Sequence, residues 1–421
     1  MSPQVKRLGV TTTLGRQTSA CSDRRDEGAS AVKIDLFNEI QNPRPWPAGH
    51  EQQRFRRAIE QAKLADELGY GCWWQVEHHG AGEFSLSSAP ELMLAAIAQH
   101  TERIRIGHSA VLAPGRFNHP IRVAERAATL DHLSGGRVEL GLTRSTIPEW
   151  RLFDISPEQA RAQTQEAFGM IPRMWTTDEF SHDSENYQIP TISIGPKPLQ
   201  QPHPPLWQAA ASPTSFEDAG RRGVGVLGTT MWESLERVGR MIKLYRAAAE
   251  SCTDPVGSFV NNQVGYFTFV HCAETDEQAM RNGAAAAAAW YTVTALRFFE
   301  AATEFAATMQ RHQDLLDSPD GGGLTGEFLR GEIDNAPTDA QLLIGRVLQG
   351  EDIPEEEVFT VLSAQQSLIV GSPQTCREKL RAYADLGIDR LMCLHQIGSI
   401  PDEAVTTSIR LIGELIPEFD R

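Results

Sequence analysis

Residues 104–146 read IRIGHSAVLAPGRFNHPIRVAERAATLDHLSGGRVELGLTRST, and this stretch contains one complete strand–helix–strand unit. The apolar run near Ile104 and the alternating run from Arg137 predict two strands. Between them, Asn118-His119-Pro120 supplies a polar cap and a first-turn proline, and Ser134-Gly135-Gly136 ends the helix. Two strands joined by a crossover helix predict a parallel sheet.

The same alternation continues in both directions from this unit. The first four strands start near Lys33, Gly71, Ile104 and Arg137, and they are spaced by about the length of one βα unit. Four later strands are expected at Pro205–Ala211, Val224–Thr229, Gln263–Cys272 and Arg390–His395. Eight parallel strands can close without an exposed edge. We therefore predict an α/β fold, a (β/α)8 TIM barrel with loop insertions.

Three stretches do not fit the minimal barrel. Residues 1–30 are rich in Ser, Thr, Arg and Gly without periodicity and are expected to form an N-terminal extension. Insertions are expected near 176–203, which is rich in Pro and polar residues, and near 302–357, which contains Gly321-Gly322-Gly323. No linker demands a second domain, so residues 31–421 are expected to form one barrel domain.

Composition excludes several classes of partner. The chain has 39 basic and 55 acidic residues, a formal charge of −16, which disfavours binding to nucleic acid or to an anionic membrane. The six cysteines are scattered without zinc-type spacing and are expected to be reduced thiols of a cytoplasmic protein. No apolar run approaches the length of a membrane span.

In a barrel of this kind, reactive groups lie at the carboxyl ends of the strands. The second strand ends in Glu77-His78-His79, where a histidine could act as a general acid or base. Two structural histidines are the simpler interpretation. A metal site is a third, but neighbouring strand residues point to opposite faces, so these three side chains do not converge easily.

The next strand ends offer features suited to a flat, phosphate-bearing ligand. Small residues at Ser109-Ala110 would let a ring approach the backbone, although by themselves they are better explained by ordinary packing of the barrel layer. Thr143-Arg144-Ser145 follows the fourth strand, where a guanidinium between hydroxyls suits a phosphate or is simply a solvated surface group.

A further candidate anion site opens the helix after the fifth strand, at Ser212-Pro213-Thr214-Ser215. Free N–H groups at a helix start can bind an anion. The same residues also make an ordinary N-cap. Each of these signals is weak alone, but all of them fall at the same end of consecutive predicted strands.

Taken together, the sequence resembles the bacterial luciferase-like flavin monooxygenases over about 34–228 and 369–401. The segments that carry the resemblance are 74–79 (WQVEHH), 118–125 (NHPIRVAE) and 130–137 (LDHLSGGR). The resemblance implies reduced FMN, bound as a diffusible cosubstrate, and dioxygen that oxygenates a small organic substrate through a 4a-(hydro)peroxyflavin. It also implies a separate flavin reductase as partner, and we expect a homodimer.

The resemblance assigns roles to residues as well. His78 matches the family's active-site histidine, with His79 beside it. The FMN phosphate is expected near Arg144, flanked by Thr143 and Ser145, and near Ser212 and Ser215. The flavin ring is expected against Ser109-Ala110, a peptide that in this family is often a non-prolyl cis bond. No metal is expected.

Two departures limit what can be carried over. The family's usual Gly-Arg-Gly is Thr143-Arg144-Ser145 here, which changes the phosphate loop, and the segment after residue 302 is long, which reshapes the substrate mouth. Three alternatives stay open. They are a deazaflavin-dependent hydride-transfer enzyme of the same superfamily, a non-catalytic flavin-binding barrel, and a metal-dependent hydrolase supported only by Glu77-His78-His79.

Overall fold

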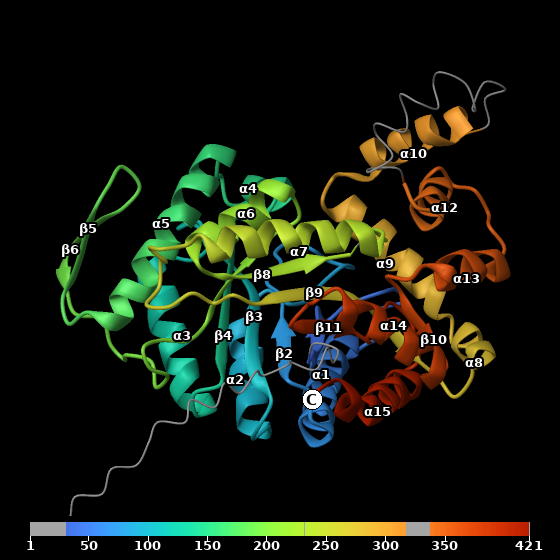
Figure 1. Ribbon diagram of the computed structural model, residues 1–421, viewed down its shortest axis with the longest axis horizontal. Coiled ribbons are helices and arrows are strands. Elements are labelled where there is room, and N and C mark those ends of the chain that lie inside the picture. The colour runs from blue at the N-terminus through green and yellow to red at the C-terminus, as the bar shows by residue number, and fades with distance from the viewer. Residues whose placement is uncertain (1–30, 231, 317–336, 421) are drawn as a thin grey trace, which may run out of the picture.

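The computed structural model describes residues 31–230, 232–316 and 337–420. Eight parallel strands close into a barrel in the order β1-β2-β3-β4-β7-β8-β9-β11, and β11 pairs again with β1 (Figure 1). Their bounds are Lys33–Asn38, Cys72–Gln75, Arg105–Leu112, Val138–Thr143, Leu206–Ala209, Gly225–Thr229, Val264–Cys272 and Arg390–Leu394. The predicted TIM barrel is confirmed, and all eight predicted strands contribute to it.

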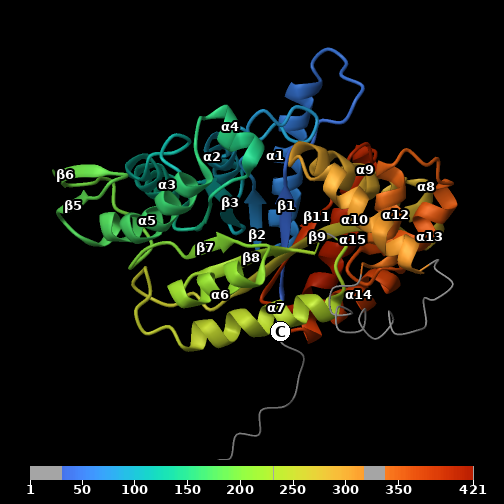
Figure 2. The same cartoon turned by 90° about the horizontal axis from the view of Figure 1, so that it is seen from above.

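Helices cover the outside of the barrel (Figures 1 and 2). Those between barrel strands are α1 (His50–Leu68), α2 (Pro90–His100), α3 (Pro120–Ser134), α4 (Ile147–Leu152), α5 (Pro157–Thr176), α6 (Pro213–Arg222), α7 (Leu235–Glu250), α14 (Pro373–Asp385) and, after the last strand, α15 (Asp402–Phe419). Glycines in the left-handed region follow the ends of three of these helices, with φ of 86° at Gly69 after α1, 69° at Gly223 after α6 and 78° at Gly387 after α14.

The amino-terminal half of the barrel interior is filled by a buried ionic and aromatic layer. Arg390 donates to both carboxylate oxygens of Asp35, at 3.2 and 2.9 Å, and its guanidinium also lies 3.4 Å from Glu139. The indole N–H groups of Trp74 and Trp207 donate to Asp35 and Glu139. This layer closes the barrel at the amino-terminal ends of the strands, so any ligand cavity must lie toward their carboxyl ends.

The remaining elements lie on opposite sides of the barrel. The hairpin β5 (Phe180–Asp183) and β6 (Gln188–Ile192) projects on one side, next to α5. On the other side lie α8 (Asp276–Arg281), α9 (Ala284–Phe298), α10 (Ala302–Leu316), α12 (Asp339–Leu348) and α13 (Glu355–Ala364) (Figure 2). The short strand β10 (Ile369–Gly371) pairs with the end of β9. Residues 1–30 and Gly321-Gly322-Gly323 lie outside the described residues.

Candidate active site

The predicted site residues lie in or directly after four strands that are neighbours in the barrel, β2, β3, β4 and β7. Because parallel strands end at the same edge, the loops after these strands share one mouth. Leu112 at the end of β3 pairs with Thr143 at the end of β4, and Leu142 pairs with Gln208 of β7. The structure therefore places His78, Ser109-Ala110, Arg144 and Ser212 around one rim.

His78 lies at this rim and is held by a carboxylate from a neighbouring loop. Its Nδ1 lies 3.3 Å from Oε1 of Glu149, which belongs to α4 in the loop after β4. The ring is surrounded by Phe84, Phe298 and Phe299, at centroid distances of 5.3, 5.4 and 5.8 Å. A carboxylate that accepts from Nδ1–H leaves Nε2 as the ring atom able to exchange a proton with a ligand.

Glu149 organises this side of the rim. Its Oε1 also accepts the backbone N–H of His79 at 2.9 Å, and its Oε2 accepts the Ser145 hydroxyl at 2.5 Å. Burial would raise the pKa of the Glu149 carboxyl, but the hydrogen bonds and the charge of His78 lower it below its ordinary value. Ser145 has a φ of 68° and has already donated its proton to Glu149, so toward another ligand its hydroxyl could only accept.

His79 has partners different from those of His78. Its Nε2 lies 3.1 Å from Glu77, and its ring stacks on Phe117. Glu77 also accepts from the Asn118 amide at 2.8 Å and from the Leu112 backbone N–H at 3.0 Å. The hydrogen bond to Glu77 raises the pKa of His79. The hydrogen bonds of Glu77 thus connect the ends of β2 and β3 to the residue that precedes α3. They hold the loop after β2, in which His78 lies.

Ser109 and Ala110 interrupt the regular pairing of β3 with β4. The register shifts between His108 and Val111, and the Ser109-Ala110 peptide is a non-prolyl cis bond, as the resemblance implied. Gly141 on β4 lies close by, because a Cβ there would be 2.6 Å from the His108 carbonyl oxygen and 3.1 Å from the Cβ of Ala110. A shift in strand register of this kind re-aims side chains beside ligand sites.

Arg144 is exposed at the rim, with its guanidinium 5.9 Å from the Trp150 ring centroid. Its backbone carbonyl accepts the Trp150 indole N–H at 2.6 Å, which anchors the loop on α4. Within the described part of the chain, no carboxylate forms an ion pair with Arg144. An arginine without a carboxylate partner is available to an external anion.

Ser212 and Ser215 form a reciprocal capping box at the start of α6. The Ser212 hydroxyl accepts from the Ser215 N–H at 3.3 Å, and the Ser215 hydroxyl accepts from the Ser212 N–H at 3.0 Å. Both predicted interpretations, N-cap and anion site, are compatible with this geometry, because an exposed helix start keeps other N–H groups free. The phosphate roles of Arg144, Ser212 and Ser215 stay predictions.

The interior of the mouth has features that fit a flat, partly polar ligand. Ser109, Thr143 and Phe267 are only half-buried although they belong to barrel strands. The Thr229 and Thr146 hydroxyl oxygens are buried and have no hydrogen-bond partner among residues 31–230, 232–316 and 337–420. Buried hydroxyls are normally hydrogen-bonded, so these two mark positions where a bound group could supply partners. The residues present are therefore compatible with a flavin.

Sequence reasoning missed two carboxyl groups at this mouth. Glu149 lies in α4, beyond the predicted Arg144 loop. Glu39 follows β1 directly, so the rule that reactive groups follow strand ends could have found it. Its Oε1 accepts a hydrogen bond from the Tyr291 hydroxyl of α9 at 2.9 Å.

Two further findings bear on the class of protein. Among residues 31–230, 232–316 and 337–420, no group of three or more His, Cys, Asp and Glu side chains is arranged to hold a metal ion. In the same part of the chain, each helix is too short or too polar to cross a membrane.

Comparison with known proteins agrees with this geometry. Residues 40–390 match the luciferase-like monooxygenase family. The chain is 26% identical over 372 residues to the oxygenase component of a flavin-dependent trigonelline monooxygenase from Acinetobacter baylyi, covering 88% of this chain and 91% of that protein. It is 29% identical to limonene 1,2-monooxygenase of Rhodococcus erythropolis over 56% of this chain and 60% of that protein.

Solved structures show the same fold. A monooxygenase from Streptomyces bottropensis superposes with a TM-score of 0.67 at 24% identity, covering 92% of this chain and all of that chain. The FMN complex of the oxygenating constituent of 3,6-diketocamphane monooxygenase from Pseudomonas putida superposes with a TM-score of 0.64 at 18% identity, covering 92% and 98%. The barrel, the residues at its mouth and the family match over 40–390 together show that this chain belongs to the luciferase-like monooxygenase family.

Proposed function

We propose that this protein is the oxygenase component of a two-component flavin monooxygenase. In this proposal it binds reduced FMN, supplied by a separate reductase, and uses dioxygen to oxygenate a small organic substrate. The observation that carries the proposal is the pairing of His78 with Glu149, 3.3 Å apart, at a rim that also presents Ser109-Ala110 and Arg144, which has no carboxylate partner among the residues that the structure describes. The family match and the name of the trigonelline relative support the reductase partner.

Each end of the flavin has candidate contacts in this chain. Arg144 and the N-terminus of α6, at Ser212, would hold the phosphate, because a guanidinium and free backbone N–H groups both suit an anion. Thr143 and Ser109 would face the flavin ring, at the place where β3 and β4 approach each other closely. When bound, reduced flavin supplies the electrons that activate dioxygen. The protein then has to orient the substrate, exclude water and manage protons.

His78 is the group best placed to manage a proton. With Glu149 accepting at Nδ1, His78 would exchange a proton with the reacting molecule at Nε2. Phe84, Phe298 and Phe299 cover the ring and keep water from it. Phe298 and Phe299 lie at the end of α9, directly before the predicted insertion at 302–357.

The test is binding followed by oxygen consumption. The purified protein is titrated with reduced FMN without oxygen, and then air and a substrate panel are added. The panel contains aldehydes, ketones, thioethers and amines, together with trigonelline and limonene because relatives are named for them. Oxygen uptake equal to product formed, with labelled dioxygen appearing in the product, is the expected result.

Other outcomes would point to the alternatives. Substrate turnover with a reduced deazaflavin and no oxygen uptake would establish hydride transfer instead. Binding of FMN without turnover of any compound would favour a non-catalytic barrel. His78→Gln should abolish turnover while FMN still binds, and retained turnover would remove His78 from the mechanism. Light scattering of the purified protein checks the expected homodimer.

A further inference from the structure

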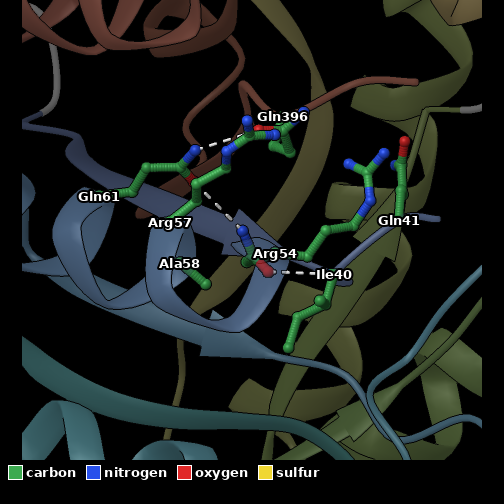
Figure 3. A pocket seen from close by; sticks show the side chains of 8 residues that line it. Ile40, Gln41, Arg54, Arg57, Ala58, Gln61 and Gln396 are labelled. Atoms are coloured by element: carbon green, nitrogen blue, oxygen red, sulfur yellow. Dashed lines mark hydrogen bonds between the residues drawn. The ribbon is translucent and has the colours of Figure 1, made fainter. Parts of the chain in front are cut away.

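A small pocket lies beside the mouth, between helix α1 and the loops after β1 and β11 (Figure 3). The pocket has room for about one water-sized group, so it can admit the tip of a ligand and not an aromatic ring. Most of the side chains that line it are polar: Arg54, Arg57 and Gln61 of α1, Asn38 and Gln41 of β1 and its loop, and Gln396 of the loop after β11.

This pocket lies across the barrel from the predicted contacts of the FMN phosphate. In the closed order of the eight strands, β1 is four places from β7, and β11 is four places from β4. Arg144 follows β4 and Ser212 follows β7. The pocket is therefore separate from the predicted phosphate site, and a ligand bound in it would be an additional one.

Hydrogen bonds hold the amide groups of the pocket in place. The Gln61 amide donates to the Gln396 amide oxygen at 3.1 Å, and the Gly398 backbone N–H donates to the Gln41 amide oxygen at 2.7 Å. The Gln396 NH2 group donates to none of the residues that the structure describes. Since its oxygen is already engaged, Gln396 can offer a ligand only a donor.

The two arginines of the pocket differ in their partners. Both side chains reach from α1 across the pocket, Arg57 toward Gln396 and Arg54 toward Gln41 (Figure 3). The Arg57 guanidinium forms an ion pair with Asp402 at the start of α15. Within residues 31–230, 232–316 and 337–420, Arg54 has no such carboxylate, and its buried Nε has no hydrogen-bond partner. Buried polar atoms are normally hydrogen-bonded, so this nitrogen marks a place where a ligand would supply an acceptor.

The pocket has an excess of positive charge. In the described part of the chain, the two guanidinium groups share one paired carboxylate, that of Asp402. Burial and the charge of Arg57 lower the pKa of Arg54, and Asp402 acts in the opposite direction. Glu39 accepts from Gln41 at 3.2 Å but does not line the pocket, and burial raises its pKa to about 7. Two nearby like charges repel, and an anion between them removes that repulsion.

We propose that this pocket binds one oxyanion group, a carboxylate or a phosphate, between Arg54 and Arg57, with the Gln396 amide as a further donor. A guanidinium presents parallel N–H groups that match two oxygens of such an anion. The bound group would give Arg54 its missing acceptor and would connect α1 to the loops after β1 and β11. The proposal does not rest on the proposed function, because it concerns binding by the protein alone.

The first experiment observes Arg54 itself. The side-chain Nε–H signals are followed by NMR in protein labelled with ¹⁵N-arginine, and Arg54→Gln assigns the signal of Arg54. Inorganic phosphate and acetate are added separately, with sodium chloride holding the ionic strength constant. We expect the Arg54 signal to move and to saturate with a dissociation constant of about 10 mM or tighter for at least one anion.

The two anions distinguish the possible sources of the ligand. Saturation with phosphate alone would assign the pocket to a phosphate group, and saturation with acetate alone would assign it to a carboxylate. Both results support the proposal. An Arg54 signal that responds to neither anion up to 50 mM would overturn it. If Arg54→Gln does not fold, Arg54→Lys, which keeps the charge and the aliphatic stem, assigns the signal instead.

Thermal unfolding is the second test, and Arg56→Gln is its matched control. Arg56 lies on the same helix, is exposed and does not line the pocket, so this variant removes the same charge outside the site. The bound anion should raise the Tm of the wild type and of Arg56→Gln by about 1 °C or more above the rise in Arg54→Gln, each measured at 50 mM. Anion binding near Arg144 contributes equally to all three proteins and cancels. Equal rises in Tm would refute binding at Arg54.

Discussion

Two buried histidines outside the active site should make this protein sensitive to mild acid. His395 lies between Tyr70 and Ser408, with ring nitrogens 3.3 Å and 2.9 Å from their hydroxyl oxygens. His271 lies 2.9 Å from the amide of Asn282. Burial lowers the pKa of His395 to about 3 and that of His271 to about 4, from an ordinary value of 6.5.

The sign of the effect follows from proton binding. Both pKa values are lower in the folded protein, so below about pH 6.5 the unfolded chain binds more protons and stability falls with pH. Between pH 8 and pH 5, each histidine should remove about 2 kcal/mol from the free energy of unfolding. This magnitude hardly depends on the folded pKa, because both folded values lie well below pH 5. Raised carboxyl pKa values such as that of Glu39 act oppositely, so the histidines must be isolated by substitution.

The assay is urea unfolding followed by circular dichroism at pH 8 and pH 5 for the wild type, His395→Gln and the double variant with His271→Gln. The wild type should lose about 2 kcal/mol more than His395→Gln between the two pH values, and about 4 kcal/mol more than the double variant. The variants will be less stable at pH 8, but only the pH-dependent difference tests the reasoning. Parallel pH dependences in all three proteins would refute it.

Three other substitutions test the site and the barrel. Glu149→Gln removes the carboxylate from Nδ1 of His78 and should lower kcat by about tenfold to a hundredfold without weakening FMN binding, measured by steady-state kinetics and flavin titration. Arg144→Ala should weaken binding of FMN by about tenfold or more but leave riboflavin binding unchanged, because riboflavin lacks the phosphate. Calorimetry measures both affinities, and an equal loss of affinity for FMN and riboflavin would contradict a phosphate contact. Arg390→Met leaves Asp35 buried without its cation and should lower the free energy of unfolding by about 3–5 kcal/mol in urea; a loss below about 1 kcal/mol would contradict the role given to this pair.

Most of the fold could be predicted from the sequence because its signals are local. The cap and stop of α3 are separated only by a helix of fifteen residues, and the alternation in β4 needs only six residues to be recognised. Gly69, Gly223 and Gly387, which follow the ends of α1, α6 and α14, all have positive φ. Such features depend on the neighbouring backbone and need no tertiary partner.

The candidate site was only partly predictable for the opposite reason. His78 and Arg144 were found because they follow strands, yet their partners come from elsewhere. Glu149 is 71 residues from His78, and Tyr291 is 252 residues from Glu39. No periodicity links residues so far apart. The separate functions of adjacent His78 and His79 also could not be assigned from sequence, because they follow from which carboxylate each ring faces.

By itself, the sequence determined the eight strands, their parallel direction and the end of the barrel where the candidate site residues lie. These follow from hydrophobic periodicity and chain connectivity, which act over short distances. Only the tertiary structure decided which groups share a buried environment, and therefore which of them change their affinity for protons. Burial and the charges of distant neighbours set those affinities, and both arise only when the closed barrel brings helix α9 and the loops after β1, β2 and β4 together.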